Sequence, residues 1–287
     1  MLRAMVDLAH HIRRSVAATR ILSVGPERSF ERPDHLATEE PMEIRVAGPR
    51  STAVPVAVTM RTPGHDFELA AGFLRSEGLV GSLEDVESVR YCDLPDNIEQ
   101  NYNIVTVRLR HPFDPDQTRR NFLINSSCGI CGTTSIEQIT KDCAPLEGGP
   151  RVRRSVVVSL PRLLRDAQSI FDQTGGLHAA GLFDAGGNLV LLREDVGRHN
   201  ALDKLVGHAL LQNMLPLRTQ VLMLSGRVSF EMVQKAAVAG ITVMGAVSAP
   251  SSLAVESARK LGMTLAGFIR GEEFNVYSHP ERIDSEN

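Results

Sequence analysis

The sequence is poor in the features that mark secreted and membrane proteins. It holds four cysteines in 287 residues, whereas a secreted disulfide scaffold would be shorter and denser in cysteine. No run of about 18 apolar residues occurs, so no membrane-spanning helix is expected. The first residues are interrupted by Asp7, His10 and His11 and lack the continuous apolar stretch of a signal peptide. We therefore expect a cytoplasmic protein that has no membrane partner.

A strong excess of charge is also absent, since the formal net charge is −3. No overall positive field would draw the chain to nucleic acid or to an anionic membrane, so an anionic ligand would have to be held by local geometry. Hydrophobic residues make up 43% and charged residues 23%, which is ordinary for a globular protein. A chain of this length can bury a core without disulfides or metals, in one large domain or two small ones.

The first 120 residues predict two segments of different kinds. Residues 1–40 are mixed in composition, with Pro26 and Pro33, and are expected to form an arm or a loosely attached start. Residues 41–120 predict a small α+β domain, because alternating apolar segments flank one stretch of helical spacing that ends near Gly78. The expected strands are 43–47, 54–60, 86–91 and 104–109, and the expected helix is 66–78.

Residues 121–287 predict an α/β domain that begins with a cysteine-containing loop. A linker is expected at 141–155, where prolines and glycines gather. Farther along, continuously apolar segments alternate with helical ones, as in a parallel sheet covered on both faces. The expected elements are a hairpin of 180–184 and 188–192, strands at 221–225, 241–247 and 264–269, and helices at 201–211, 230–239 and 253–261.

The cysteine-containing loop carries Cys128 and Cys131 in the sequence Ser-Ser-Cys-Gly-Ile-Cys-Gly. Residues 121–136 contain no acidic side chain, and two arginines lie just upstream. Thr134 and Glu137 match a helix capping box, so a helix would aim its positive end at the loop. Both features favour a thiolate, which is the reactive form of cysteine. The spacing and surroundings therefore predict cysteine chemistry at this loop.

Three interpretations of the C-x-x-C pair remain open from the residues alone. The pair can act as a nucleophile or sulfur carrier, as half of a structural zinc site, or as a redox disulfide. A four-cysteine zinc site would need a second pair, whereas Cys92 and Cys143 are single and far apart. These two are expected to be ordinary small residues, and no metal site is predicted.

Small residues stand where three strands are expected to give way to helices or turns. These segments are 174–178, 225–230 and 247–253, and they include His178, Ser225 and Arg227. Ligands of open α/β sheets bind at the carboxyl ends of strands, and helix N-termini bind phosphate groups. Capped turns without a ligand would show the same pattern. An anion site with Arg227 as a charged contact is thus one of two possibilities.

Two further segments combine charged side chains with imidazole or aromatic rings. Residues 193–200 form the densest polar cluster, which includes His199 and directly precedes a predicted helix. An exposed charged turn is the alternative to a site there. Residues 270–279 contain Arg270, Phe274 and Tyr277, which suit contact with a purine or a pterin but equally suit the packing of a last strand.

Several long motifs, in the right order, resemble the FdhD family over about residues 40–279. They are 62–74, the cysteine loop 126–132, 174–180, 193–204, 225–232, 246–252 and 274–278. The resemblance implies a sulfurtransferase that is an accessory protein of formate dehydrogenase. It also implies a main domain with a cytidine-deaminase-like α-β-α fold, beside the smaller N-terminal α+β domain, and a homodimer.

The resemblance also implies roles for individual residues. Cys128 would carry a persulfide received from a cysteine desulfurase, with Cys131 as its partner. The sulfur acceptor would be the molybdenum cofactor, bis-molybdopterin guanine dinucleotide. Contacts to that cofactor are expected from a C-terminal segment and from the predicted anion sites. They comprise Phe268, Ile269, Arg270, Gly271, Glu272, Glu273, Phe274, Asn275 and Tyr277, together with His178, His199, Ser225 and Arg227.

The expected fold invites one rival function, that of a zinc deaminase. Such enzymes need His-x-Glu upstream of Pro-Cys-x-x-Cys. Here the only His-x-Glu is at His279 and Glu281, downstream of the cysteines, and Ser127 rather than proline precedes Cys128. We therefore do not expect deamination. The remaining alternative is a chaperone that binds the molybdenum cofactor without catalysis and uses the cysteines as a docking or metal loop.

Overall fold

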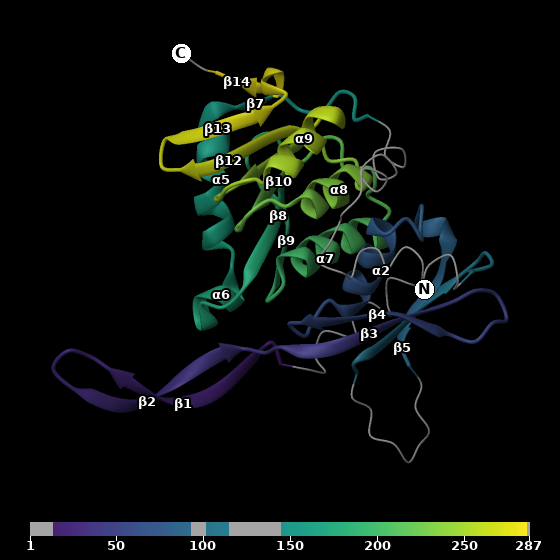
Figure 1. Ribbon diagram of the computed structural model, residues 1–287, viewed down its shortest axis with the longest axis horizontal. Coiled ribbons are helices and arrows are strands. Elements are labelled where there is room, and N and C mark those ends of the chain that lie inside the picture. The colour runs from purple at the N-terminus through teal and green to yellow at the C-terminus, as the bar shows by residue number, and fades with distance from the viewer. Residues whose placement is uncertain (1–13, 93–101, 115–144, 286–287) are drawn as a thin grey trace.

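The computed structural model describes residues 14–92, 102–114 and 145–285, which form a mixed α/β protein. Cys128 and Cys131, the capping box at Thr134 and the first part of the expected linker lie outside the described residues. Two sheets dominate the molecule, and a two-stranded arm projects from it (Figure 1). Within the described ranges, no helix is long and apolar enough to cross a membrane.

The larger sheet has six strands in the order β13-β12-β11-β10-β8-β9. Strands β10, β11 and β12 are parallel, and the outer pairs β8–β9 and β12–β13 are antiparallel. The predicted succession of hairpin, helix and β-α-β-α-β is confirmed. The elements are β8 His178–Phe183, β9 Leu189–Asp195, α7 Arg198–Leu211, β10 Val221–Leu224, α8 Phe230–Val238, β11 Val243–Ala246, α9 Ser252–Lys260, β12 Thr264–Arg270 and β13 Glu273–Ser278.

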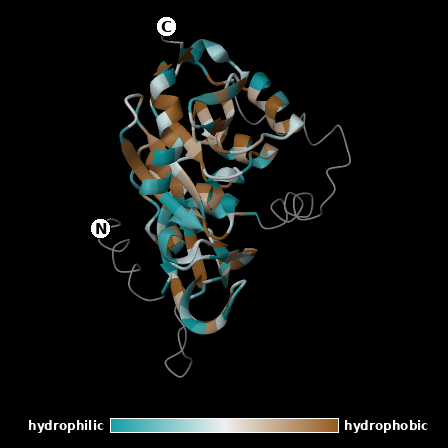
Figure 2. Ribbon diagram, turned by 90° about the vertical axis from the view of Figure 1, so that its left-hand side faces the viewer, coloured by the Kyte–Doolittle hydropathy of each residue, from teal (hydrophilic) through white to brown (hydrophobic). Residues whose placement is uncertain are grey.

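Helices cover both faces of this sheet. Alternate strand residues point to opposite faces, so Leu222 and Met244 pack against α7, α8 and α9, whereas Val221 and Val243 pack against α5 (Arg154–Asp166). Hydrophobic residues concentrate where helices and strands meet (Figure 2). This double coverage explains why the parallel strands are almost entirely apolar, with polar side chains only at the two ends of β12.

Helix α5 was not predicted, and the expected linker is wrong over its last residues. Residues 145–151 have no helix or strand, but β7 occupies Val152–Arg153 and α5 begins at Arg154. Pro161 lies inside α5 and usually marks the end of a helix, which hid the helical spacing of its buried apolar residues. A short helix, α6 (Ser169–Thr174), follows, and β7 pairs with β14 (Ile283–Asp284).

The smaller sheet has four strands in the order β4-β3-β6-β5, with α2 (Asp66–Ser76) against one face. The predicted strands and helix of this unit are confirmed. The strands are β3 Glu40–Ala47, β4 Val54–Arg61, β5 Val86–Tyr91 and β6 Ile104–Leu109, with the short 3-10 helix η2 (Leu83–Asp85) before β5. Buried residues alternate along β3, where Met42, Ile44 and Val46 face α2.

The expected arm contains regular structure, an antiparallel hairpin of β1 (Val16–Val24) and β2 (Ser29–Ala37). It projects away from both sheets, and β2 leads almost directly into β3 (Figure 1). The hairpin was missed because it buries no continuous face. Leu22, Val24 and Phe30 remain exposed, so its sequence has no alternation of core and solvent residues.

Candidate functional site

The two sheets are joined by a close crossing of α2 and α7. A Cβ atom on Gly207 would lie 1.8 Å from the carbonyl oxygen of Glu68, and one on Gly72 would lie 1.8 Å from that of Asp203. The backbones therefore touch where these glycines face one another. This contact fixes α7, whose first turn borders the candidate site, to the smaller sheet.

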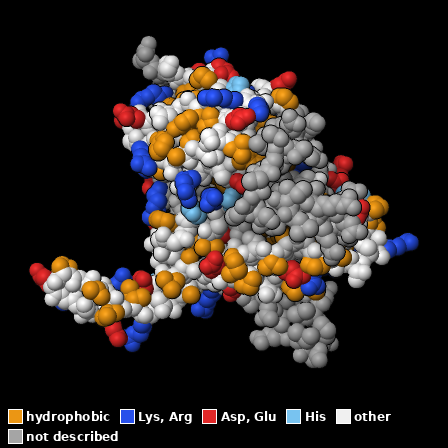
Figure 3. Space-filling model, viewed as in Figure 1, with side chains coloured by type: hydrophobic (Ala, Val, Ile, Leu, Met, Phe, Trp, Pro, Cys, Tyr) orange, Lys and Arg blue, Asp and Glu red, His pale blue; other side chains and the backbone are white. Residues whose placement is uncertain are grey.

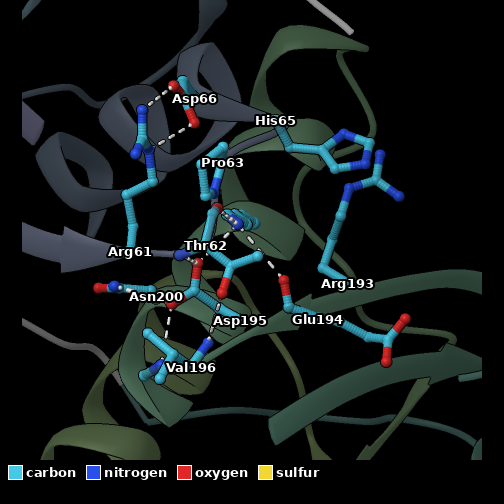
Figure 4. A network of polar contacts seen from close by, with 12 residues as sticks. Arg61, Thr62, Pro63, His65, Asp66, Arg193, Glu194, Asp195, Val196 and Asn200 are labelled. Atoms are coloured by element: carbon cyan, nitrogen blue, oxygen red, sulfur yellow. Dashed lines mark hydrogen bonds and ion pairs between the residues drawn. The ribbon is translucent and has the colours of Figure 1, made fainter. Parts of the chain in front are cut away.

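The buried carboxylate of Asp195 forms a second connection between the two sheets (Figure 4). One Asp195 oxygen lies 2.6 Å from Lys204 Nζ and accepts a hydrogen bond from the backbone N–H of Thr62. The other accepts from Gly197 N–H and from Asn200 Nδ2. Lys204 also donates to the carbonyl of Thr62 at 2.8 Å. The network thereby connects the strand before α7 to the smaller sheet.

Two more ion pairs lie at the same junction. Arg193 pairs with Glu68 at 2.6 Å, and His208 lies 2.9 Å from the same carboxylate. Burial alone would raise the pKa of Glu68, but hydrogen bonds from Arg193 and His208 outweigh it and hold the pKa well below its ordinary value. Arg61 makes a bidentate contact with Asp66. Much of the polar cluster at 193–200 thus holds the two sheets together.

The candidate site lies at one edge of the larger sheet, where several chain ends converge. Strands β9, β10 and β11 end there, and helices α7, α8 and α9 begin there. The first N–H groups of a helix have no partner within it and carry partial positive charge. Three helix N-termini at one edge therefore make an environment that favours anions.

Basic side chains gather at this edge. Burial, then the charges of Arg198 and Arg227, lower the pKa of His178 below its ordinary value. Burial and Arg198 also lower the pKa of His199. A Cβ on Gly226 would lie 3.2 Å from His178 Nδ1, so the ring packs against the loop after β10. Figure 3 shows Lys and Arg side chains beside histidine near the middle of the face in view.

The predicted residues His178, His199, Ser225 and Arg227 come together at this edge. Ser225 follows β10, and its Oγ accepts a hydrogen bond from the N–H of Ala179 at 2.8 Å. His199 lies in the first turn of α7, with Nε2 3.4 Å from Ser229 Oγ at the start of α8. Residues as far apart in sequence as His178 and Arg227 therefore share one small surface.

The predicted C-terminal segment forms the β12–β13 hairpin on the other side of β11 from β10. Phe268 and Arg270 are exposed, and the Arg270 guanidinium lies 5.9 Å from the centre of the Phe268 ring. Ile269 is buried in the core, and Phe274 packs partly against it, so these two side chains face inward. Tyr277 is half-buried beside Gly267. The other members, at the turn or on β13, are exposed: Gly271, Glu272, Glu273 and Asn275.

This hairpin connects to the basic edge through the loop after β11. The N–H of Phe268 donates to the carbonyl of Ser248 at 3.2 Å. A Cβ on Gly267 would lie 3.0 Å from Pro250 Cδ, and Val228 and Pro250 form a β-bridge. The loops after β10 and β11 and the end of β12 therefore form one continuous surface.

Comparison with known proteins decides the family. The model of the FdhD/NarQ family matches residues 37–284. This chain belongs to the FdhD/NarQ family. The resemblance seen in the motifs is thereby confirmed.

Relatives in the FdhD/NarQ family match nearly the whole chain. A protein of Nocardia farcinica named sulfur carrier protein FdhD is 48% identical over 276 residues, which cover 95% of this chain and 96% of the relative. A protein of the same name from Streptomyces avermitilis is 51% identical over 88% of this chain and 90% of the relative. A crystal structure of a formate dehydrogenase accessory protein from Desulfotalea psychrophila superposes with a TM-score of 0.73 at 26% identity, covering 94% of this chain and all of that one.

Sequence reasoning did not select two residues at this edge of the FdhD/NarQ chain. Arg198 was seen only as a member of the polar cluster, and nothing separated it from Arg193, which pairs with Glu68 at the junction. Gln168 was missed because it lies in the turn between α5 and the short helix α6, neither of which was predicted. Its side chain is buried and lines a cavity of about 530 Å³ beside His178 and Ser225.

Proposed function

We propose that this protein carries sulfur as a persulfide on Cys128, from a cysteine desulfurase to bis-molybdopterin guanine dinucleotide that formate dehydrogenase requires. The names of its relatives, sulfur carrier protein and formate dehydrogenase accessory protein, support this role. The structural observation that supports it most is the basic edge, where three helix N-termini meet Arg198 and Arg227. The cofactor is a dinucleotide, and its phosphate groups suit such an edge.

In the proposed sulfur transfer, both cysteines of the loop react. The Cys128 thiolate attacks the terminal sulfur of the desulfurase persulfide, and the desulfurase cysteine leaves as a thiolate. The Cys131 thiolate then attacks the Cys128 sulfur, which releases hydrosulfide to molybdenum and forms a Cys128–Cys131 disulfide. An external thiol reduces that disulfide and resets the pair.

The predicted cofactor contacts divide into two groups in this proposal. Arg227, His178 and His199 lie at the basic edge and suit the phosphates, with Ser225 beside them. The β12–β13 hairpin supplies the exposed Phe268 and Arg270, a ring and a guanidinium that suit a heterocycle. The buried side chain of Ile269 contributes by holding the hairpin on the core.

Three broader features belong to the same proposal. The larger sheet with its two helical layers is assigned a cytidine-deaminase-like fold, which the α-β-α layering supports. The protein is a homodimer and works in the cytoplasm, where a cysteine desulfurase and reduced thiols are present.

Incubation with a cysteine desulfurase and cysteine tests the proposal by intact mass. We expect a gain of one sulfur atom, lost on treatment with a thiol reductant and absent in Cys128→Ala. Cys92→Ala is the matched control and is expected to gain sulfur like the parent, since Cys92 lies at the end of β5 in the smaller sheet. No gain of sulfur by a protein that still binds the cofactor would contradict the proposal and leave a non-catalytic chaperone.

The affinity for GDP, used as a probe of the guanine nucleotide end, is expected to depend on the protonation of His178. Burial, Arg198 and Arg227 lower the pKa of the free ring, and a bound diphosphate would raise it. The complex therefore takes up protons, and this contribution to affinity grows as pH falls from about 7 to below about 6.

Calorimetric titrations with GDP across this pH range measure the linkage. The quantity compared is the pH dependence of the affinity in the parent and in His178→Gln. The variant is expected to have a flatter profile, with the remaining slope due to His199 and the phosphate itself. His35→Gln, on the exposed arm, serves as the control. Identical profiles for the parent and His178→Gln would rule out the linkage.

A further inference from the structure

The β1–β2 arm is mostly exposed, although its base is held by its own chain. At the base, Ser15 Oγ donates to the carbonyl of Pro63 at 2.8 Å, and a Cβ on Gly176 would lie 3.5 Å from the Ala37 Cβ. The rest of the arm projects away from both sheets (Figure 1). An isolated two-stranded hairpin is at best marginally stable in water. We therefore expect the arm to pack against a surface outside its own chain.

One face of the arm carries two strongly exposed apolar side chains. Leu22 and Val24 lie two positions apart on β1, so both point to the same face. Leu22 is 61% exposed and Val24 is 75% exposed. Phe30 belongs to the other face, where the Arg28 guanidinium lies 5.3 Å from the centre of its ring. The face with Leu22 and Val24 is therefore the one that most needs a cover.

The smaller sheet has a second exposed apolar pair, on its edge strand β4. Val58 is 67% exposed and Met60 is 47% exposed, because α2 covers the opposite face of this sheet. The arm extends from the start of β3 away from the sheet, so it leaves the pair of its own chain bare (Figure 1). Two copies that exchange arms would cover both pairs at once.

The strand register allows one two-fold axis to bring the two pairs together. The exposed residues have these partners on β2 and β3: Leu22–Glu31, Val24–Ser29, Met60–Pro41 and Val58–Glu43. The residue midway between Glu31 and Pro41 is Leu36, which is also midway between Ser29 and Glu43. When two copies cross antiparallel about an axis near Leu36, Leu22 meets Met60 of the second copy and Val24 meets Val58. Such a contact is self-complementary, as the interface of a two-fold dimer must be.

The area of the arm favours this reciprocal exchange over a different partner. Each strand has nine residues, so one face of the arm measures roughly 30 by 10 Å. One arm on a foreign surface would bury about 600 Å² over both sides of the contact, whereas stable interfaces bury about 1,200–2,000 Å². Two exchanged arms would bury about 1,200 Å² and so reach that range.

We propose that the β1–β2 arm docks on the outer face of the smaller sheet of a second copy of this chain, and that the second copy returns the contact. Leu22 and Val24 pack against Met60 and Val58 of the other copy. The inference rests on the proposed homodimer and names the surfaces that join its two copies. Since Ala37 adjoins Gly176, just before β8, each arm leads from the candidate site of one copy to the smaller sheet of the other.

Sedimentation equilibrium of the full chain tests the exchange. The parent is expected to be a dimer, and the double variant Leu22→Glu, Val24→Glu is expected to dissociate at least about a hundredfold more readily, because each new charge would be buried against hydrocarbon. The double variant Leu189→Glu, Val190→Glu is the matched control. These two residues are also exposed on an edge strand, β9, at 41% and 46%, and the control is expected to remain a dimer.

The two ways in which this measurement can contradict the proposal are distinct. Unchanged dimer affinity in the arm variant would overturn the exchange and leave the proposed homodimer standing. A monomeric parent would overturn both. The sulfur-carrier role is measured separately, by the gain of sulfur on Cys128 in the parent.

Chemical cross-linking identifies the surface on which the arm docks and uses variants that carry no new charge. In chains whose four native cysteines are replaced by serine, Val24→Cys with one tag is mixed with Val58→Cys with another. The mixture is treated with a bismaleimide that spans about 10 Å, the separation of packed sheets. Linked pairs that carry both tags are expected, and Val190→Cys in place of Val58→Cys should give none. Links only between two Val24→Cys chains would place arm against arm and overturn the proposal, as would the absence of links.

Discussion

Lys204→Met is expected to destabilise the protein by about 3–5 kcal/mol. Lys204 and Asp195 are almost completely buried, at 1% and 0% side-chain exposure, with 2.6 Å between Nζ and the carboxylate. Methionine fills much of the same space but leaves the Asp195 charge without its counterion. The carbonyl of Thr62, which accepts from Lys204, also loses a donor.

Chemical denaturation monitored by circular dichroism measures this loss at neutral pH. Lys260→Met is the matched control, because the Lys260–Glu256 pair lies one helical turn apart on the exposed surface of α9. Exposed pairs contribute about 0–1 kcal/mol, so the control should unfold nearly as the parent does. Similar small losses in both variants would show that the buried network does not hold the two sheets together.

Gly207→Ala is expected to destabilise the protein by about 3 kcal/mol through overpacking. The new Cβ would lie 1.8 Å from the carbonyl oxygen of Glu68, and both atoms belong to or adjoin helix backbone that cannot move without displacing a whole helix. Alanine otherwise favours a helix over glycine by about 1 kcal/mol. Helix propensity alone would make Gly207→Ala more stable. A loss of stability can therefore be ascribed to the α2–α7 contact.

The matched control for Gly207 is Gly176→Ala, where the added Cβ would meet the Ala37 Cβ at 3.5 Å and the Thr174 carbonyl oxygen at 3.9 Å, both ordinary contacts. Thermal unfolding should show a large decrease for Gly207→Ala and little change for the control. If Gly207→Ala matched the parent, the helices would not be in backbone contact, and the crossing described for α2 and α7 would be wrong.

The larger sheet was predictable because its signals are local. Strands β10 and β11 are apolar throughout, β12 is apolar between Thr264 and Arg270, and each strand is followed by a change to helical or turn composition. Helix α5 and the β1–β2 hairpin were not predicted, because their local sequence patterns are misleading. Pro161 interrupts α5, and the exposed hairpin β1–β2 has no buried face to give an alternating pattern.

The candidate site was predictable only in part, because polar residues near it form hydrogen bonds with residues far away in sequence. Asp195 bonds to Thr62, and Arg193 bonds to Glu68, each more than 120 positions away. Nothing within residues 193–200 separates these junction residues from Arg198 and His199, which face the basic edge. Strand order alone brings His178 beside Ser225, since β8 pairs with β10.

The junction also serves the site itself. Asp195 accepts from Gly197 N–H directly before α7, so the buried network sets the position of that helix N-terminus. Arg198 and His199 follow in its first turn. A site held by packed elements and a buried network is positioned before a ligand arrives, which lowers the cost of binding.

The central claim, that Cys128 delivers its sulfur to the molybdenum cofactor, is tested most directly by a single-turnover transfer. Protein loaded with isotopically labelled persulfide by a desulfurase is freed of excess cysteine and mixed, without added reductant, with molybdenum cofactor that lacks the transferred sulfur. The cofactor is then analysed by mass spectrometry. We expect labelled sulfur on the cofactor, in an amount that matches the persulfide lost from Cys128. Unlabelled cofactor, whether the persulfide persists on Cys128 or its sulfur is lost as free hydrosulfide, would contradict this delivery.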